Sequence, residues 1–367
     1  MRRVILEGCN GEWAQECYLP FLIEKAAKGN IELWAVDIQP QINLSADVAA
    51  LWQAVQGDGK ACYVDKIRNK ESYERLSDMN YVFVVTPGQY HCEIAEFWLK
   101  RLSPKGKIFI EKPLDASLES ALRLDEKIGE KEGKEAVFAF DHYFARAYPF
   151  LRHKDYYLKE IGGVEKIECN ILESSRIARK RANALDKGMI FDLFCHVLAV
   201  VSAVVKQNLT CSETKLQAVG LEEVKAARYV GCPISGETFA WIKLIINSNI
   251  EVLGAVGKCV GTSEDKFMKL YGPNGRIELN LRPRGSRFHV FDSQGRQVEE
   301  KELDSNPVES FLEEVLQGKE HPLSAPGVLT FDAALKILKM LDEAKNHIDR
   351  MPEYRCNESI SEILGRF

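Results

Sequence analysis

The sequence predicts an α/β fold in two domains, and two patterns along the chain carry this prediction. Over residues 1–145, short apolar runs alternate with amphipathic segments, which is typical of an N-terminal doubly wound parallel sheet covered by helices. From residue 164 onward, long alternating runs are separated by hairpin signals such as Pro273-Asn274-Gly275. Residues 146–367 are therefore expected to form a C-terminal α+β domain with a large, mostly antiparallel open sheet. The length of 367 residues also favours about two domains.

The composition points to a globular protein that acts on a small molecule. Hydrophobic residues make up 46% of the chain and charged residues 28%, as is ordinary for soluble proteins. The net charge of −5 argues against nucleic-acid or anionic-membrane partners. No apolar run approaches the roughly 18 to 20 residues of a membrane span. Scattered cysteines without a C-x-x-C pair, and no apolar leader, predict reduced thiols and a cytoplasmic location.

The first expected strand, residues 3–7, runs into a glycine turn of the form G-x-x-G-x-x-A and then a helix as far as Lys28. In this order, backbone N–H groups of the turn can approach a pyrophosphate, and the helix N-terminus attracts it. The sequence therefore predicts a Rossmann dinucleotide-binding domain, although such a turn can also be purely structural. The residues expected to contact the cofactor here are Gly8, Asn10, Gly11, Glu12 and Trp13.

The second expected strand, residues 31–36, ends in Asp37. A carboxylate at this place can accept both ribose hydroxyls of the adenosine, and it repels a 2′-phosphate. No basic residue occurs between Ile38 and Ala46. Both observations favour NAD over NADP, while the alternative is that Asp37 is a turn residue before Pro40.

The rest of the first domain continues the alternation. Helices are expected over residues 46–55, 69–76, 92–102 and 118–131, and strands near residue 63 and over 81–85, 106–110 and 136–140. Open α/β sheets bind ligands at the carboxyl ends of their strands. Thr86-Pro87 and His91 follow one such strand end, and Glu111-Lys112-Pro113 follows another. Because proline disfavours helix at the residue before it, Lys112 is expected at the ligand edge, with an ordinary surface lysine as the alternative.

The second domain carries a pair of ionisable residues. Its strands are expected over residues 164–171, 216–221, 237–247, 250–256, 267–271, 277–281 and 288–291, and helices near 187–205, 307–316 and 330–347 are expected to cover one face. Asp192 and His196 stand four residues apart in the first of these helices, so they share a face. Their neighbours are apolar, and burying two ionisable groups requires a partner or a purpose. Together with Lys112 they predict catalysis, while a satisfied core histidine is the alternative.

These motifs resemble two related families. The glycine turn, the Thr86-Pro87 turn with its histidine, E-K-P, and D-x-x-x-H resemble the Gfo/Idh/MocA family of NAD(P)-dependent sugar and cyclitol oxidoreductases over nearly the whole chain. Residues 8–14, 111–114, 141–146 and 188–192 are similar to the G-A-S-G-D-L-A, E-K-P-F, D-H-Y-L-G-K and G-I-I-R-D stretches of glucose-6-phosphate dehydrogenases. Those enzymes are longer, place the histidine five residues after the aspartate and commonly use NADP, so His196 and Asp37 depart from them.

The resemblance implies an NAD-dependent dehydrogenase acting on CH–OH groups, which transfers a hydride between nicotinamide and a secondary hydroxyl of a sugar or cyclitol. It implies that His196 takes the hydroxyl proton, that Lys112 stabilises the oxygen, and that Asp192 holds a substrate hydroxyl or the imidazole. The residues that would lie beside the cofactor, in addition to the glycine turn and Asp37, are Thr86, Pro87, His91, Glu111 and Lys112.

Basic residues suggest a phosphorylated substrate such as glucose 6-phosphate, because guanidinium groups pair with phosphate through two bonds. The residues expected to contact it, besides Lys112, Asp192 and His196, are His142, Tyr143, Arg146, Arg176 and Arg179. The alternatives are an unphosphorylated sugar, inositol or aminosugar, or a non-catalytic NAD-binding regulatory protein of the same fold. No metal site is expected, since ligand spacing is not recognisable. A homodimer or homotetramer is expected, because apolar residues lie on both faces of the strand at 237–247.

Overall fold

The computed structural model describes residues 1–130, 135–174, 185, 187–205, 219–247, 249–283, 285–318 and 322–367. The chain forms two compact units. Unit 1 consists of Met1–Phe140, Phe311–Lys319 and Val328–Leu335, and unit 2 of Asp141–Ser310, Glu320–Gly327 and Lys336–Phe367. Within the described ranges, no helix combines the length and the apolar character that crossing a membrane requires.

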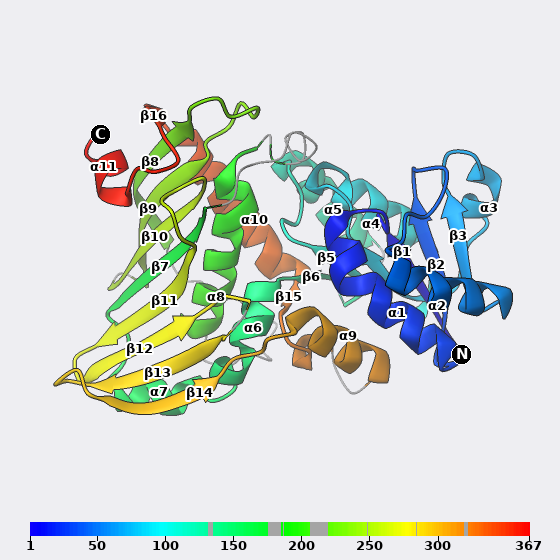
Figure 1. The fold of residues 1–367 in the computed structure, drawn as a ribbon, viewed down its shortest axis with the longest axis horizontal. Helices are drawn as coiled ribbons and strands as arrows, with labels where there is room; N and C mark the ends of the chain where they lie inside the picture. Colours follow the sequence, from blue (N-terminus) through cyan, green and yellow to red (C-terminus); the bar gives the residue numbers. More distant parts are fainter. Residues whose placement is uncertain are drawn as a thin grey trace. The chain divides into compact units, whose positions relative to one another are not determined.

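Unit 1 is built on a seven-stranded sheet in the order β15-β6-β5-β4-β1-β2-β3 (Figure 1). Its strands are β1 Arg2–Glu7, β2 Ile31–Asp37, β3 Ala61–Asp65, β4 Met79–Val84, β5 Leu102–Glu111, β6 Val137–Phe140 and β15 Val328–Thr330. Only β15 runs antiparallel to its neighbour, so the predicted α/β class with a doubly wound parallel sheet is confirmed. The order reverses at β1, which lies between β4 and β2, and such a switch point is where these sheets bind ligands.

Helices connect the strands of unit 1. They are the π-helical turn η1 Ala14–Tyr18, α1 Leu19–Ala27, α2 Ala46–Gly57, α3 Lys70–Glu74, the 3₁₀ turn η2 Gly88–Tyr90, α4 His91–Leu99 and α5 Leu118–Glu130. The strands between them are short and buried on both faces, as β2 and β6 show, which is why they read as continuous apolar runs in the sequence.

A row of aromatic rings forms the core of unit 1. The ring centroids of Phe83 and Phe109 lie 5.6 Å apart, and those of Phe109 and Phe138 lie 5.7 Å apart. Phe311 of α9 (Pro307–Gln317) joins this row, stacked on Phe140 at 4.0 Å. The expectation that the helix at residues 307–316 covers the second sheet is therefore wrong from residue 311 onward. The amphipathic pattern of a helix shows that one face is buried but does not identify the sheet that receives it.

Unit 2 contains a nine-stranded sheet in the order β14-β13-β12-β11-β7-β10-β9-β8-β16. Its strands are β7 Lys166–Glu173, β8 Val219–Tyr229, β9 Phe239–Ile246, β10 Ile250–Lys258, β11 Asp265–Gly272, β12 Gly275–Asn280, β13 Arg287–Asp292, β14 Gln297–Glu302 and β16 Glu353–Tyr354. The pairs β7–β10 and β8–β16 are parallel and the others antiparallel. The mostly antiparallel second sheet is confirmed.

One face of this sheet is covered by a buried helix. The helices of unit 2 are α6 His142–Leu151, α7 Lys154–Glu160, the π-helical turn η5 Ile190–Phe194, α8 Cys195–Val205, the 3₁₀ turn η6 Pro322–Ser324, α10 Phe331–Asn346, which begins in unit 1, and α11 Ile360–Leu364. The helix α8 is buried from Cys195 to Val204, and it packs against β7 and α6 (Figure 1). The predicted helix near residues 187–205 is thus present, beginning at residue 190.

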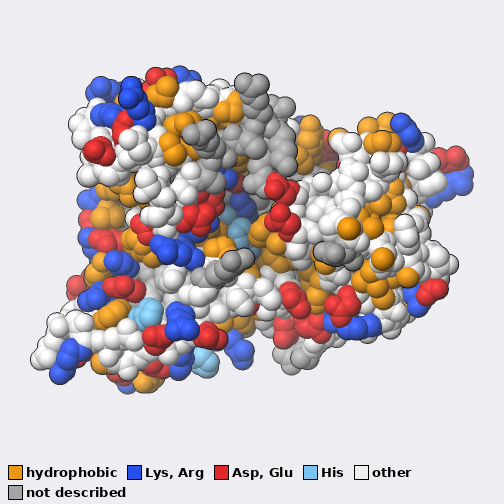
Figure 2. All heavy atoms as spheres, viewed as in Figure 1, with side chains coloured by type: hydrophobic (Ala, Val, Ile, Leu, Met, Phe, Trp, Pro, Cys, Tyr) orange, Lys and Arg blue, Asp and Glu red, His pale blue; other side chains and the backbone are white. Residues whose placement is uncertain are grey.

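The other face carries charges of both signs. Lys243 pairs with Glu222 at 2.9 Å and with Glu251 at 3.3 Å, and acidic and basic side chains alternate along the visible edge of the sheet in Figure 2. Phe239, one of the apolar residues expected to favour a homo-oligomer, is buried in a cluster with Tyr354 of β16. The homo-oligomer stays a prediction, supported by partly buried residues such as Trp241 on this face.

Candidate functional site

The turn after β1 is tight, and the residue that comes closest to the segment after β4 is a glycine, which has no side chain. Gly8 has a φ of +86°, and the N–H groups of Gly8 and Cys9 donate to the carbonyl of Val36 at 2.9 and 3.2 Å. A Cβ on Gly8 would stand 2.8 Å from Cγ2 of Thr86, which follows β4. Both the dihedral and this contact require glycine. Gly11 and Glu12 are exposed in the same turn, so backbone groups stand open at the switch point of the sheet.

Asp37, predicted to bind the adenosine ribose, is 8% exposed and holds the glycine turn in place. Its Oδ2 accepts from the N–H of Asn10 at 3.0 Å, and its Oδ1 accepts from the next two backbone N–H groups at 2.8 and 3.1 Å. A carboxylate oxygen can accept more than one hydrogen bond, so these contacts leave capacity for ribose hydroxyls. The side chain of Asn10 faces the loop after β2, donating to the carbonyl of Gln41 and accepting from the N–H of Asn43.

The turn after β4 joins the turn after β5 through a buried imidazole. His91 is 1% exposed, with Nε2 2.6 Å from the carbonyl oxygen of Thr86 and Nδ1 2.8 Å from that of Pro113. Burial lowers the pKa of His91, although the two carbonyls act in the opposite direction. Of the predicted cofactor residues, Pro87 is exposed. His91 is buried and connects the two turns through its contacts with the carbonyl oxygens of Thr86 and Pro113.

Glu111 ends β5 as a buried carboxylate with three donors. Its Oε1 accepts from Nε1 of Trp13 at 2.9 Å and from the hydroxyl of Tyr18 at 2.7 Å, and its Oε2 accepts from the N–H of Lys112 at 3.2 Å. The side chain of Lys112 is half-buried at the carboxyl end of the sheet, and the peptide bond to Pro113 is cis. Two predicted cofactor residues, Trp13 and Glu111, are therefore hydrogen-bonded to each other.

These residues of unit 1 fit a dinucleotide. Gly8 lies at the switch point where such sheets bind nucleotides, and its lack of a side chain lets the turn pack directly against Thr86. The Oγ1 atom of Thr86 is buried without a hydrogen-bond partner in the structure, and a buried hydroxyl in this state is suited to a ligand. The glycine turn would hold the pyrophosphate, Asp37 the adenosine ribose and Thr86 the nicotinamide ribose.

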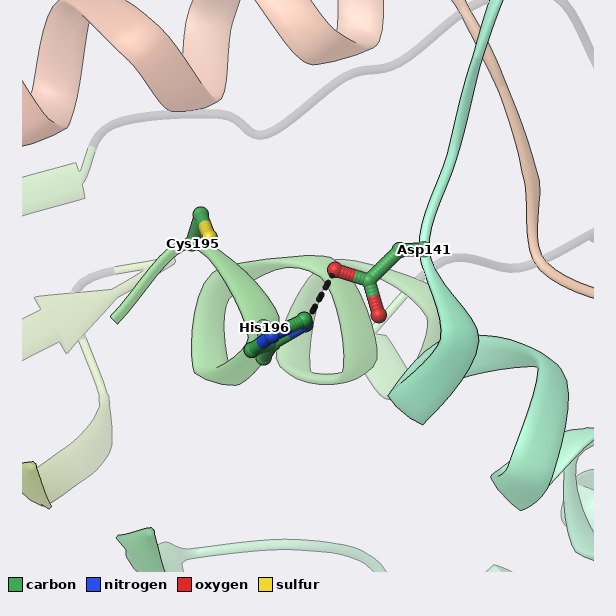
Figure 3. Close-up of side chains that lie close together, drawn as sticks. All are labelled: Asp141, Cys195 and His196. Atoms are coloured by element: carbon green, nitrogen blue, oxygen red, sulfur yellow. Dashed lines mark hydrogen bonds and ion pairs between the residues drawn. The ribbon is translucent and has the colours of Figure 1, made fainter. Parts of the chain in front are cut away.

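In unit 2, a carboxylate and an imidazole form a close pair. Asp141 caps α6, with Oδ1 accepting from the N–H groups of Tyr143 and Phe144 at 2.9 Å each. Its Oδ2 lies 2.7 Å from Nδ1 of His196 on α8, both side chains are buried, and Figure 3 shows them pointing toward each other. Because the carboxylate accepts, Nδ1 carries a proton, and whenever the imidazole is neutral Nε2 is its accepting nitrogen. This is the arrangement of an oriented general base.

Asp141 was not among the predicted site residues. The resemblance implied that Asp192, four residues before His196, holds either a substrate hydroxyl or the imidazole, and the alternative was a satisfied core histidine. A signal was present, because Asp141 directly follows a strand at the carboxyl edge of the first sheet, where functional carboxylates are expected. Its pairing with a residue 55 positions later depends on the tertiary fold.

Two predicted substrate residues surround this pair. The rings of His142 and Tyr143 lie 4.5 and 4.4 Å from that of His196, measured between centroids. Burial and the nearby carboxylate of Glu173 raise the pKa of Tyr143 well above its usual value, so its hydroxyl stays protonated as a hydrogen-bond donor. The structure thus brings together His142, Tyr143 and His196.

A chain of alternating charges starts at Asp192. Its carboxylate pairs with Lys258 at 3.5 Å, Lys258 pairs with Glu173 at 3.4 Å, and Glu173 pairs with Lys266 at 3.0 Å. The four side chains are between 7% and 19% exposed. Burial opposes ionisation of Glu173, but Lys258 and Lys266 together hold its pKa below the usual range. The carboxylates can accept hydrogen bonds from a polar ligand, and the ammonium groups can donate hydrogen bonds to it.

Glu173, Lys258 and Lys266 were missed from the sequence. They stand at the ends of three strands that are neighbours only in the folded sheet, where Glu173 faces Lys258 in register. A signal that could have found them is a charged residue at the end of an otherwise apolar strand, as in Gly257-Lys258 after residues 252–256. Charged residues at strand ends are common, so the register of the strands was needed to show that these three residues are neighbours.

The helix η5–α8 begins at a buried carboxylate. The N–H of Ile190 donates to Oε1 of Glu237 at 2.9 Å, and Lys345 pairs with the other oxygen. Burial raises the pKa of Glu237, and Lys345 opposes this. Gly188 has a φ of +84°, and a Cβ on it would come within 2.4 Å of the Glu237 carboxylate oxygens. The glycine of the G-M-I-F-D stretch is therefore required by its dihedral and its neighbour.

Arg146, expected to bind phosphate, is 5% exposed and ties α6 to the β12–β13 connection. Its Nη1 donates to the carbonyl of Arg282 at 2.7 Å and to Oγ of Ser286 at 3.2 Å. The other two arginines predicted to contact phosphate, Arg176 and Arg179, lie outside the described residues. The phosphate site stays a prediction.

Within the described part of the chain, one group of side chains has atoms near enough to share a metal ion. Asp141, Cys195 and His196 have potential ligand atoms within 4.8 Å of one another. Adjacent helical residues point about 100° apart, and in Figure 3 Cys195 leaves α8 in a different direction from His196. The thiol of Cys195 also donates to the carbonyl of Asp192 at 3.4 Å. These contacts favour proton sharing between Asp141 and His196 over metal binding.

A family described as the NAD-binding domain of glucose-6-phosphate dehydrogenase matches residues 48–148, a range that includes Lys112 and Asp141 but ends before His196. Curated protein sequences give no match. The part of the chain that carries the glycine turn lies outside the matched range.

Several solved structures share the fold over nearly the whole chain. Glucose-6-phosphate 1-dehydrogenase from Mycobacterium avium has a TM-score of 0.72 at 15% identity, covering 97% of this chain and 94% of its own. KijD10, a 3-ketoreductase from Actinomadura kijaniata in complex with TDP-benzene and NADP, has a TM-score of 0.66 at 13% identity, covering 96% and 99%. UDP-N-acetylglucosamine 3-dehydrogenase GnnA from Acidithiobacillus ferrooxidans has a TM-score of 0.62 at 16% identity, covering 94% and 97%. At these identities the likeness shows that the fold is shared.

Proposed function

We propose that this protein is an NAD-dependent dehydrogenase that transfers a hydride between nicotinamide and a secondary hydroxyl group of a sugar or cyclitol, as the Gfo/Idh/MocA resemblance implies. The observation that carries the proposal is the buried contact of 2.7 Å between Oδ2 of Asp141 and Nδ1 of His196. A hydride leaves a carbinol carbon only if the hydroxyl proton also leaves, and an imidazole titrates in the range suited to take it.

The proposed roles follow from the donors and acceptors. The nicotinamide, when bound, supplies the hydride acceptor. His196 takes the hydroxyl proton on Nε2, and Asp141 stabilises the resulting imidazolium through its Nδ1–H. The resemblance implies that Lys112 of unit 1 donates a hydrogen bond to the same substrate oxygen, which stabilises negative charge developing there.

The charged cluster of unit 2 supports a polyhydroxylated substrate. Asp192 and Glu173 can accept hydrogen bonds from hydroxyl groups, while Lys258 and Lys266 can donate to them. Lys266 also pairs with Glu264 at 3.4 Å, so carboxylates of the chain already neutralise both ammonium groups, which suits an uncharged polyol better than a dianion.

A phosphorylated sugar such as glucose 6-phosphate is the second candidate. The match of residues 48–148 to the NAD-binding domain of glucose-6-phosphate dehydrogenase favours it, as does the resemblance of Asp141-His142-Tyr143 to D-H-Y-L-G-K. Arg146 stands at the position of the final lysine of that stretch. Comparing a free sugar with its 6-phosphate distinguishes the two candidates, because only a phosphate site gives the ester the higher kcat/KM.

NAD is proposed over NADP because of Asp37. Its carboxylate ends β2, and the loop from Ile38 to Ala46 contains no basic residue that could pair with a 2′-phosphate. Like charges of Asp37 and a phosphate repel each other more strongly in a partly buried setting than in water.

The test is incubation of the purified protein with NAD or NADP and a panel of sugars, cyclitols and their phosphates, followed by absorbance of the reduced cofactor. We expect turnover with at least one substrate and a loss of about a hundredfold or more in His196→Ala and Lys112→Ala, with dinucleotide binding retained. Dinucleotide binding without turnover on any member of the panel would favour the alternative of a regulatory NAD-binding protein.

A further inference from the structure

Three hydrogen-bond donors converge on Glu111, and two of them come from the segment that follows the glycine turn. Trp13 and Tyr18 both donate to Oε1, while the backbone N–H of Lys112 donates to Oε2. Glu111 is 5% exposed, so its carboxylate depends on these partners for stabilisation. The contacts lie within unit 1 and join β5 to the start of the first helix.

The local helix geometry explains how two residues five positions apart reach one oxygen. With 3.6 residues per turn, Trp13 and Tyr18 would point about 140° apart on an α-helix. The segment Ala14–Tyr18 is instead a π-helical turn, closed by a hydrogen bond from Leu19 N–H to the Ala14 carbonyl. The i→i+5 repeat of such a turn brings residues five apart onto one side, and π-turns are frequent at functional sites.

Both donors remain donors over the ordinary pH range. The indole N–H of Trp13 does not ionise, and burial together with the adjacent Glu111 carboxylate raises the pKa of Tyr18 well above its usual value. Removing either one takes one donor from Oε1 and so weakens the stabilisation of the buried carboxylate in its present position. Lys112 is the residue whose backbone the same carboxylate holds.

We propose that Trp13 and Tyr18 are positioning residues that act through Glu111: they fix the backbone of Lys112 and couple its placement to the dinucleotide-binding turn. The role assigned to Lys112 rests on the proposed function. Trp13 lies two residues after Gly11 of the dinucleotide-binding turn. A dinucleotide bound to this turn therefore affects the position of Trp13 and, through Glu111, that of Lys112.

The variants Trp13→Phe and Tyr18→Phe remove one donor each and keep an aromatic ring. We expect kcat to fall at least tenfold in both, with the KM for NAD within threefold of the original. In a Lys112→Ala background, neither substitution should lower kcat further, since a residue that acts through Lys112 has nothing left to position. Independent, multiplying losses in that background would overturn the proposal.

A matched control is Trp98→Phe, which removes an indole donor at 3.1 Å from another buried carboxylate of unit 1, Glu7. Its effect on stability should resemble that of Trp13→Phe, without the loss of kcat. Comparable kcat losses in both variants would indicate a general effect on folding and contradict a positioning role.

A second measurement does not need turnover. The rate of reductive methylation of Lys112, followed by mass spectrometry with exposed Lys105 as internal reference, should change at least threefold in Trp13→Phe and Tyr18→Phe and remain unchanged in Trp98→Phe. An unchanged Lys112 rate would overturn the proposal even if no sugar is oxidised. Absence of turnover in the original protein would instead count against the proposed dehydrogenase function alone.

Discussion

Replacing Asp141 with asparagine separates the two functions that this carboxylate combines. One oxygen caps α6 by accepting from the N–H groups of Tyr143 and Phe144, and the other contacts His196 at 2.7 Å. An asparagine can keep its carbonyl oxygen at the cap, where it ranks with aspartate. Its NH₂ group then faces Nδ1, and since that group only donates, the imidazole must accept on Nδ1 and carry its proton on Nε2.

The expected magnitude follows from this exchange of protons. With a proton on Nε2, the neutral imidazole of His196 cannot take one from the substrate, so kcat should fall by about 10²–10⁴, the range of general-base assistance. Stability should fall by roughly 1–3 kcal/mol, because one charge-assisted hydrogen bond is lost. Asp141→Ala also loses the helix cap, which costs about 1 kcal/mol more.

The assay combines the rate of NADH formation, NAD binding and urea unfolding for both Asp141 variants. Ser359→Ala is the control, because Ser359 caps α11 in a capping box and its loss should cost similar stability without a change in kcat. If Asp141→Asn folds, binds NAD and keeps kcat within threefold of the original protein, Asp141 is a helix cap alone and the base assignment is refuted.

Four further outcomes are expected. NAD should give the higher kcat/KM, and Asp37→Ala should relax this preference; equal values for both cofactors in the original protein would contradict it. Lys258→Met should raise the KM for the sugar at least tenfold and leave NAD binding unchanged, as measured by fluorescence titration. Burial raises the pKa of Glu7 above the usual 4.5, against the opposing effect of Lys66, so in the pH window between 4.5 and the raised pKa its native form retains a proton that the unfolded chain has lost. Stability should therefore fall as pH rises, by up to about 1.4 kcal/mol per pH unit, and Glu7→Gln should remove this slope in urea unfolding; parallel curves would refute it. We also propose a homo-oligomer, which a monomeric mass by light scattering at micromolar concentration would exclude.

The elements of unit 1 could be predicted from the sequence because their signals are local. Strands such as β2 and β6 are buried runs of apolar residues, and the residues between them carry helical periodicity or turn glycines. Strand ends could also be predicted, so Thr86 and Lys112 were expected at the carboxyl edge, where the structure places them.

Long-range pairings could not be predicted in the same way. Asp141 and His196 are 55 positions apart, and their contact depends on how α6 packs against α8. The same holds for Phe311, whose helix follows β14 of the second sheet and returns to the first sheet. An amphipathic pattern specifies that a face is buried, while the choice of partner is settled by the whole fold.

Helical periodicity also fails at the starts of two helices of the candidate site. A positive-φ glycine precedes a π-helical turn in both: Gly8 stands before η1, and Gly188 stands before η5. A π-turn is rare, so it persists where its surroundings stabilise it. At η1 the stabilising group is Glu111, and at η5 it is Glu237, each a buried carboxylate that accepts from the segment. A sequence template with 3.6 residues per turn therefore misses these contacts, because they arise from a geometry that only the tertiary acceptors make favourable.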